Sequence, residues 1–197
     1  VSFCKVSLKE IFSHLPQCLI LFIPVIAYSI YRVMDKTMIG FFANTTELGY
    51  YESAEKIINI PISLVSALGT VMMPHMAKSS DKELDNKFSS TFYLCYFFII
   101  PMVLGLIVIS KDFTIMFFGK EFLKTANIII LLLPTVVFGA MTNIIRSNYL
   151  IPKSKNKIYV MSTAIGAIIN LIINIILIKK YGAYGACIGT ITQNFQF

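Results

Sequence analysis

The feature that most constrains the fold is a series of long uncharged stretches that recur along the whole chain. Each is close to the length with which an α-helix crosses roughly 30 Å of hydrocarbon at about 1.5 Å per residue. Backbone groups in hydrocarbon must satisfy their own hydrogen bonds, and nothing alternates with period two, so the stretches predict helices rather than barrel strands. The predicted spans are approximately residues 15–42, 57–77, 88–110, 125–145, 158–178 and 181–197, the last of them truncated.

Composition agrees with a membrane protein. Of the 197 residues, 56% are hydrophobic and 14% are charged, which leaves too few polar side chains to cover a soluble domain of this size. The formal net charge of +7 comes largely from lysines and arginines between the apolar stretches, where they would face lipid headgroups. We therefore interpret the charge as a topology signal, and we expect the lipid bilayer, not a nucleic acid, as the partner.

These features predict an all-α fold: a polytopic membrane bundle of about six transmembrane helices that forms a single domain over residues 1–197. Lysine and arginine are more frequent on the face that holds the amino terminus and residues 151–157, which places that face in the cytoplasm. The chain begins with Val1 and stops at Phe197 inside a hydrophobic run, so we expect it to be a fragment of a longer protein.

The first predicted span carries charged residues without a turn signal between them and the apolar run. Arg32, Asp35 and Lys36 follow this run directly, and on a helix Tyr28 shares a face with Arg32 and with Asp35 or Lys36. Charge inside a membrane indicates a functional site, so these four residues are predicted to line a water-filled cavity that binds substrate. The alternative is that the charges mark the end of a helix and pair with each other at the surface.

The fifth span carries a stripe of small and polar residues at i, i+4 spacing: Ser162, Gly166, Asn170 and Asn174. This side of the helix cannot face lipid comfortably. We interpret the stripe as a contact between helices, with a substrate path as the alternative. Tyrosines near the span ends, Tyr51 among them, are interpreted as part of an interfacial belt.

A second candidate site lies near the end of the fourth span. Asn143 and Arg146 share a face there and would make a hydrogen-bonding, positively charged mouth that suits a phosphate group. The alternative is that Arg146 only extends to the lipid headgroups.

Catalytic and cofactor chemistry find little support. The four cysteines form no C-x-x-C pair, there are only two histidines, and no metalloprotease, nucleophile-elbow or P-loop motif occurs. We therefore predict that the protein is not an enzyme and has no catalytic residues, metal or cofactor. Coupling to H⁺ or Na⁺ stays open.

Three short stretches resemble a known family. They are residues 31–40 (YRVMDKTMIG), 47–57 (ELGYYESAEKI) and 71–74 (VMMP), and the likeness continues through residues 118–122 (FGKEF) to the end of the chain. Together they resemble the polysaccharide repeat-unit flippases of the multidrug/oligosaccharidyl-lipid/polysaccharide exporter superfamily, at the start of that family's second half. The Asp-Lys and Gly-Tyr-Tyr elements carry most of this resemblance.

The resemblance implies a transporter of two pseudo-symmetric bundles, of which this chain supplies the C-terminal one and a missing N-terminal bundle of the same polypeptide the other. It implies alternating access in the bacterial cytoplasmic membrane. The implied substrate is an undecaprenyl-pyrophosphate-linked oligosaccharide, flipped from the cytoplasmic to the outer leaflet for surface polysaccharide biosynthesis. Carried onto this chain, the family's charged helix corresponds to Arg32, Asp35 and Lys36.

Two other functions remain open at this point. A drug or cation efflux transporter of the same superfamily would have a cavity dominated by carboxylates and aromatics rather than by Arg and Lys. A membrane-bound glycan polymerase or acyltransferase would need positioned acid and base residues near a lipid headgroup, and the scarcity of histidine argues against that class.

Overall fold

The computed structural model describes residue 29 and residues 33–77, 79, 81–151 and 156–194, and every regular element in these ranges is helical. The elements are a helix over residues 33–42, α2 (Thr45–Ala77), α3 (Asp81–Phe118), the 3-10 turn η1 (Lys120–Phe122), α4 (Leu123–Ile145), the π-helical turn η2 (Arg146–Leu150), α5 (Asn156–Tyr181) and α6 (Ala183–Asn194). The predicted all-α fold is confirmed.

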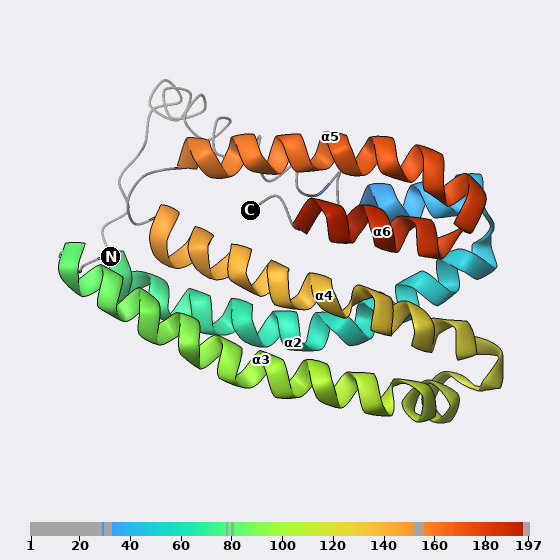
Figure 1. Ribbon diagram of the computed structural model, residues 1–197, viewed down its shortest axis with the longest axis horizontal. Coiled ribbons are helices and arrows are strands. Elements are labelled where there is room, and N and C mark those ends of the chain that lie inside the picture. Colours follow the sequence, from blue (N-terminus) through green and yellow to red (C-terminus); the bar gives the residue numbers. More distant parts are fainter. Residues whose placement is uncertain (1–28, 30–32, 78, 80, 152–155, 195–197) are drawn as a thin grey trace, which may run out of the picture.

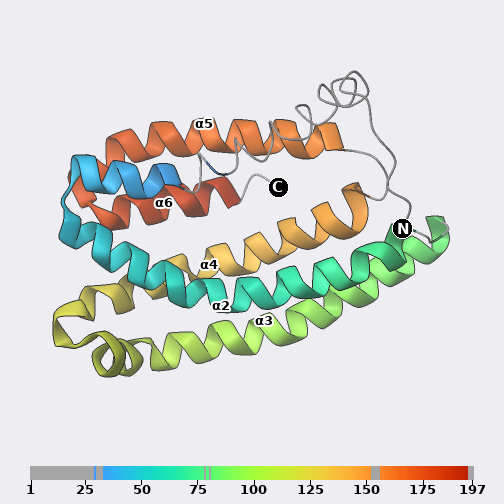
Figure 2. The ribbon, with the colours of Figure 1, turned by 180° about the vertical axis from the view of Figure 1, so that it is seen from behind.

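Successive long helices run in opposite directions along the long axis of the molecule (Figures 1 and 2). The helix over residues 33–42 lies with α5 and α6 on one side, and α2, α3 and α4 lie on the other. The start of α2, the turn η1 and the α5–α6 turn meet at one end of the bundle. The end of α2, the start of α3 and η2 lie at the opposite end, so the connections alternate between two ends as they must in a multi-pass bundle.

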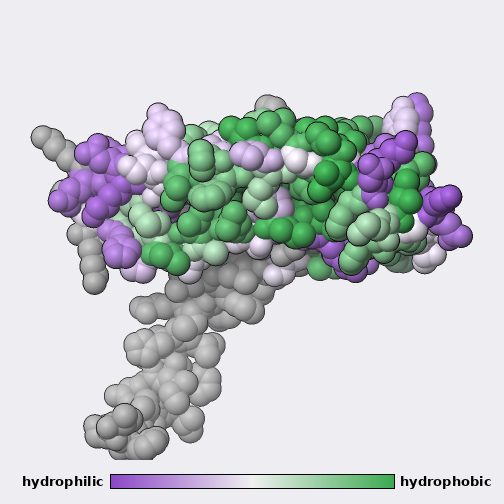
Figure 3. All heavy atoms as spheres, turned by 90° about the horizontal axis from the view of Figure 1, so that it is seen from below, coloured by the Kyte–Doolittle hydropathy of each residue, from purple (hydrophilic) through white to green (hydrophobic). Residues whose placement is uncertain are grey.

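Within the part of the chain that the structure describes, four helices are long and apolar enough to cross a membrane: Thr45–Met76, Glu83–Phe118, Lys120–Leu150 and Met161–Tyr181. The surface agrees with this, because Figure 3 has hydrophobic residues along the middle of the molecule and hydrophilic ones gathered at both ends. Large apolar side chains such as Tyr93, Phe97 and Ile168 are exposed. Such a surface suits lipid.

Two helices differ in length from their predicted spans. The span predicted over residues 57–77 begins at Thr45, and the one predicted over residues 88–110 runs from Asp81 to Phe118. The prediction ended each span at the nearest charge, but charged residues near helix ends continue the helix when they find partners. Glu47 and Glu55, for example, pair with lysines of other segments.

The remaining predicted spans overlap other helices. Residues 125–145 lie within α4, and residues 158–178 lie within α5. Residues 33–42 of the first predicted span and residues 183–194 of the last are helical, and the rest of the first span, apart from Ser29, together with residues 195–197, lies outside the described residues.

The helix boundaries have local causes. The Asn44 side chain accepts the backbone N–H of Glu47 at 2.8 Å, which caps the first turn of α2. Gly119 and Gly182 have positive φ angles of 94° and 58°, which L side chains rarely adopt, and they separate α3 from η1 and α5 from α6. Glycine therefore sets the sharp turns at the end of the bundle where the α5–α6 connection lies.

The core is centred on α4, which packs against α2, α3 and α6. Its buried side chains are mostly apolar and include Ile128, Ile129, Leu132, Leu133, Val136, Ala140 and Ile144. Because α4 is surrounded on several sides, it has apolar residues around most of its circumference, which is the pattern of a central helix.

The α5–α6 hairpin depends on close backbone approach. A Cβ added at Gly185 would collide with the backbone of Leu177 and Ile178 in α5, and backbone atoms cannot turn away. Small residues let membrane helices approach in this way.

We expect Gly185→Ala to lower the melting temperature of the detergent-solubilised protein, because overpacking of this kind costs about 1–3 kcal/mol. Gly49→Ala in α2 is the matched control, since a Cβ there meets nothing within 4 Å. The control should melt at the same temperature or slightly higher, because alanine favours helix over glycine. Equal melting temperatures for the two variants would contradict the close α5–α6 approach.

Candidate functional site

A buried carboxylate lies where four helices meet. Asp35, on the helix over residues 33–42, is only 5% exposed. Its Oδ1 accepts a hydrogen bond from Asn174 Nδ2 at 2.6 Å, and its Oδ2 accepts one from Thr190 Oγ1 at 2.8 Å. The Tyr51 hydroxyl lies 3.4 Å from Oδ2 and 3.2 Å from Thr190 Oγ1. Both carboxylate oxygens thus have polar partners in an otherwise apolar interior, as a buried charge requires.

We call this group the polar centre and define it as Asp35, Tyr51, Asn170, Asn174 and Thr190. Asn174 Nδ2 also donates to Asn170 Oδ1 at 2.9 Å, which extends the network one turn along α5. The five side chains come from the helix over residues 33–42, α2, α5 and α6. The centre therefore joins the two sides of the bundle.

Gly189 makes this convergence possible. A Cβ added there would collide with the Asn174 amide and lie 3.1 Å from Asn170 Nδ2. The absent side chain leaves room for the two asparagines between α5 and α6, while Thr190, the next residue, reaches Asp35.

The polar centre is incompletely satisfied. Asn174 Oδ1 and Asn170 Nδ2 are buried without a hydrogen-bond partner among the described residues. Buried polar atoms nearly always have hydrogen-bond partners. Unpaired ones are typical of places that bind a water molecule or an ion. Asp35 supplies one negative charge, and its neighbours supply neutral oxygens.

This arrangement suits a proton or a small monovalent cation. Hard cations take oxygen ligands, and a single carboxylate balances a single positive charge. Among the described residues there is no group of three or more His, Cys, Asp or Glu side chains that could hold a metal ion. The chemistry of the centre is therefore that of one charge with neutral oxygen donors around it.

A second carboxylate, Glu47, holds the end of the bundle nearest this centre. Its Oε1 forms an ion pair with Lys124 at the start of α4, and its Oε2 accepts the backbone N–H of Ala183 at 3.0 Å. The Lys124 ammonium also lies 5.0 Å from the centre of the Tyr184 ring. Glu47 thereby ties α2 and α4 to the start of α6, the helix that brings Thr190 to Asp35.

The structure separates the predicted charges Asp35 and Lys36. Lys36 Nζ lies 2.6 Å from Glu55 Oε2 and 3.9 Å from Glu52 Oε1, both on α2. Neighbouring residues on a helix point about 100° apart, so Asp35 enters the polar centre while Lys36 turns to the glutamates. Tyr28 and Arg32 lie outside the described residues, and their role in a shared face stays a prediction.

Asn143 and Arg146, the other predicted pair, lie at the opposite end of α4. Asn143 Nδ2 donates to Ser66 Oγ of α2 at 3.1 Å, and Arg146 begins η2 with its side chain partly exposed.

Sequence reasoning missed two members of the polar centre. Tyr51 was interpreted as part of an interfacial belt, but it is buried at 4% exposure and its hydroxyl faces Asp35. Thr190 carried no signal of its own. Asn170 and Asn174 were noted as a stripe between helices, which is correct, and the same stripe also holds the carboxylate.

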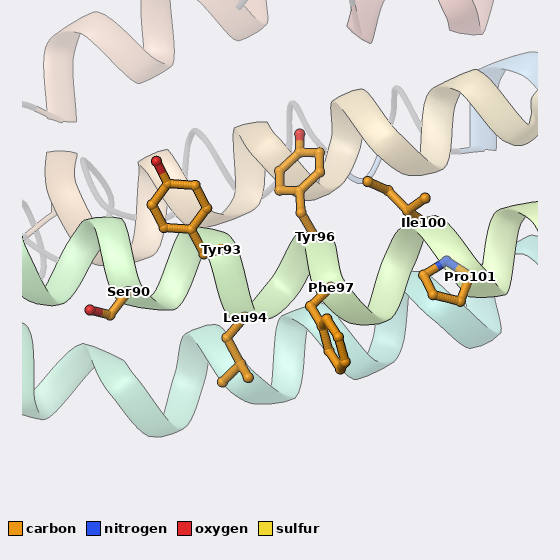
Figure 4. Close-up of a pocket in the computed structure, with 7 residues that line it drawn as sticks. All are labelled: Ser90, Tyr93, Leu94, Tyr96, Phe97, Ile100 and Pro101. Carbon is orange, nitrogen blue, oxygen red and sulfur yellow. The ribbon is translucent and has the colours of Figure 1, made fainter.

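The surface hollows are apolar and lie elsewhere. One is lined by seven residues of α3 alone, with Tyr93 and Tyr96 pointing to one side and Leu94 and Phe97 to the other (Figure 4). Because a single helix lines it, it is an outer face rather than an enclosed cavity. A second lies between α2 and α3 around Pro61 and Gly105. Neither contains a predicted site residue.

Comparison with known proteins identifies the family. Residues 2–127 match the model of a polysaccharide biosynthesis protein family. The chain is 26% identical over 81% of its length to the probable low-salt glycan biosynthesis flippase Agl15 of Haloferax volcanii. It is 31% identical over 69% of its length to the lipid II flippase MurJ of Bacillus subtilis, and 25% identical over 92% to a putative O-antigen transporter of Shigella dysenteriae.

The aligned region spans 34%, 26% and 46% of these three relatives, in the same order. No solved structure matches the chain. By their names the relatives are flippases and a transporter, not enzymes. Since the family model covers more than half of the residues, the chain belongs to the polysaccharide biosynthesis protein family and is distantly homologous to the flippases of the multidrug/oligosaccharidyl-lipid/polysaccharide exporter superfamily.

Proposed function

We propose that the chain forms one bundle of an alternating-access transporter that flips lipid-linked oligosaccharides for surface polysaccharide biosynthesis. The substrate is an undecaprenyl-pyrophosphate-linked repeat unit, moved from the cytoplasmic to the outer leaflet of a bacterial cytoplasmic membrane. Residues 1–197 are the C-terminal bundle of about six spans, and an N-terminal bundle completes the cavity. The observation that carries this proposal is the buried carboxylate of Asp35 among membrane-spanning helices.

A charge inside a membrane protein needs a reason. Asp at the centre of a membrane helix costs about 3 kcal/mol even on insertion-based scales, and a neutral residue would pack there without this cost. The hydrogen bonds from Asn174 and Thr190 offset part of the cost but leave the net charge in place. We assign Asp35 to binding the coupling ion, a proton or Na⁺, rather than to direct contact with the substrate.

The asparagines give the centre two ligand arrangements. In the present one, Asn174 turns its N–H group toward Asp35, while its oxygen is buried without a partner among the described residues. Rotation of the amide by half a turn places that oxygen beside the carboxylate, where it can coordinate a cation. Ion binding thereby changes the contacts between α5 and the helix over residues 33–42, which is how occupancy can bias the conformation of the bundle.

The substrate's pyrophosphate needs cations of its own. Moving it through hydrocarbon is prohibitive unless protein groups replace its hydration shell. We assign this role to Lys36, together with Arg32 and Tyr28, which precede it in the sequence. Lys36 is paired with Glu52 and Glu55 in the present state. The pyrophosphate would therefore displace these carboxylates from the Lys36 ammonium group. Asn143 and Arg146 form a second phosphate contact at the other end of α4.

Asp35→Asn in the native gene tests the role of the buried charge. The amide keeps the size of the side chain and most of its hydrogen bonding, so the protein should reach the membrane in normal amounts. We expect surface polysaccharide to fall at least about fivefold, the low end of typical coupling effects, with lipid-linked precursor accumulating inside the cell. Asp112→Asn is the matched control, because Asp112 is an exposed carboxylate on α3.

Normal polysaccharide in cells carrying Asp35→Asn would contradict the proposal. Loss of drug resistance with normal polysaccharide would favour the efflux transporter instead.

Exchanging the charges of Lys36 and Glu55 tests the substrate contact. If Lys36 served only its ion pair, the double variant K36E/E55K would restore the pair and the function. We expect it to restore protein stability relative to K36E while polysaccharide stays low, because the cation has moved to α2. Recovery of polysaccharide together with stability would show that Lys36 is structural. Melting temperature and surface polysaccharide are measured for both single variants and the double variant.

A further inference from the structure

The turn η2 has an unusual backbone. The N–H of Ile151 bonds to the carbonyl of Arg146 at 3.0 Å, an i to i+5 bond, and residues Arg146–Leu150 form a π-helical turn at the end of α4. A π turn holds one residue more than the α-helix it interrupts, and such turns are rare and concentrate at functional sites.

The π turn buries the side-chain amide of Asn148. Asn148 is fully buried, at 0% exposure, and neither its Nδ2 nor its Oδ1 has a hydrogen-bond partner among the described residues. Burying an unpaired amide is unfavourable, and an apolar side chain of similar size would fill the same space without that cost. The present packing therefore does not explain why the residue is asparagine.

Its neighbours in η2 contact other helices. Ser147 lies against α2 at Gly69, where an added Cβ would come 2.9 Å from Ser147 Oγ. The ring of Tyr149 lies 5.5 Å from the ring of Phe88 on α3. The absent side chain at Gly69 leaves the space that Ser147 occupies, so the turn packs closely on α2.

The turn also lies on the connection to the polar centre. It links α4 to α5, and it contacts α5 directly. Since α5 also carries Asn174, which bonds to Asp35, and Asn170, which bonds to Asn174, η2 and the polar centre contact the same helix.

We propose that η2 is a conformational switch for alternating access. In the present state the turn is π-helical and Asn148 is buried and unpaired. In the other state the turn relaxes to an α-helix, and the Asn148 amide reaches water or substrate at that end of the bundle. The inference rests on the proposed transport function, in which the bundle passes between two states.

Asn148→Leu should favour the present state over the other. We expect the melting temperature to rise by about 4 °C, the size of effect that removal of one buried unpaired polar group gives in a chain of this length. Transport, measured as surface polysaccharide, should fall at least about fivefold. Thr142→Val is the control, because the Thr142 hydroxyl bonds only to the carbonyl of Phe138 in its own helix. A lower melting temperature, or unchanged transport, would overturn the switch.

Asn148→Cys gives a readout that does not depend on the substrate. A water-soluble maleimide cannot reach position 148 in the present state, so labelling of the N148C thiol above that of the unmodified chain reports the second state. We expect such labelling in membrane preparations in which the maleimide has access to the η2 end of the bundle. Its absence would overturn the proposal. If labelling occurs but Asp35→Asn leaves polysaccharide normal, the proposed function fails at Asp35, while the second state of η2 is still observed.

Discussion

The structure depends on one constraint: the carboxylate of Asp35 is buried among membrane helices and must be held there by polar groups from other elements. Asn174 and Thr190 supply short hydrogen bonds to its two oxygens, and each comes from a different helix of the chain's last third. The charge is therefore also a cross-link, since it fixes α5 and α6 against the helix over residues 33–42. Removing the partners would leave an unpaired buried charge, which is far more costly than never having placed one there.

Close helix packing makes that arrangement possible. Gly185 lets the backbones of α5 and α6 approach, and Gly189 leaves the space that the two asparagines occupy. At the end of the bundle, Glu47 pairs with Lys124 of α4 and accepts the first N–H group of α6, so α6 cannot slide along α5 without breaking its contact with Glu47. The same features leave Asn174 Oδ1 and Asn170 Nδ2 without partners among the described residues. A well-packed frame around an under-satisfied centre is the arrangement expected where an ion or proton comes and goes.

The positions of the helices could be predicted from the sequence more accurately than their ends. Likewise, Asp35 could be predicted as a candidate site residue, whereas its partners Tyr51 and Thr190 could not. Uncharged runs locate α2 to α5 because hydrocarbon excludes charge, but they misplace the start of α2, since Glu47 and Glu55 are neutralised by lysines distant in sequence. Asp35 was predicted because an acidic residue after an apolar run is conspicuous. Tyr51 and Thr190 were not, because they lie 16 and 155 positions from Asp35 in the sequence and meet it only in the fold. The π turn at Asn148 was not predicted from the sequence either.

The most direct test of the central claim is the melting temperature of the purified protein in Na⁺ against choline, and at lowered pH in choline, for the unmodified chain and for Asp35→Asn. A ligand that binds the folded state at a concentration of 100 times its Kd stabilises it by about 2.7 kcal/mol. The account predicts that Na⁺ or protons raise the melting temperature of the unmodified chain by several degrees and leave that of Asp35→Asn unchanged. A melting temperature that responds to neither ion, or that responds equally in both proteins, would contradict it.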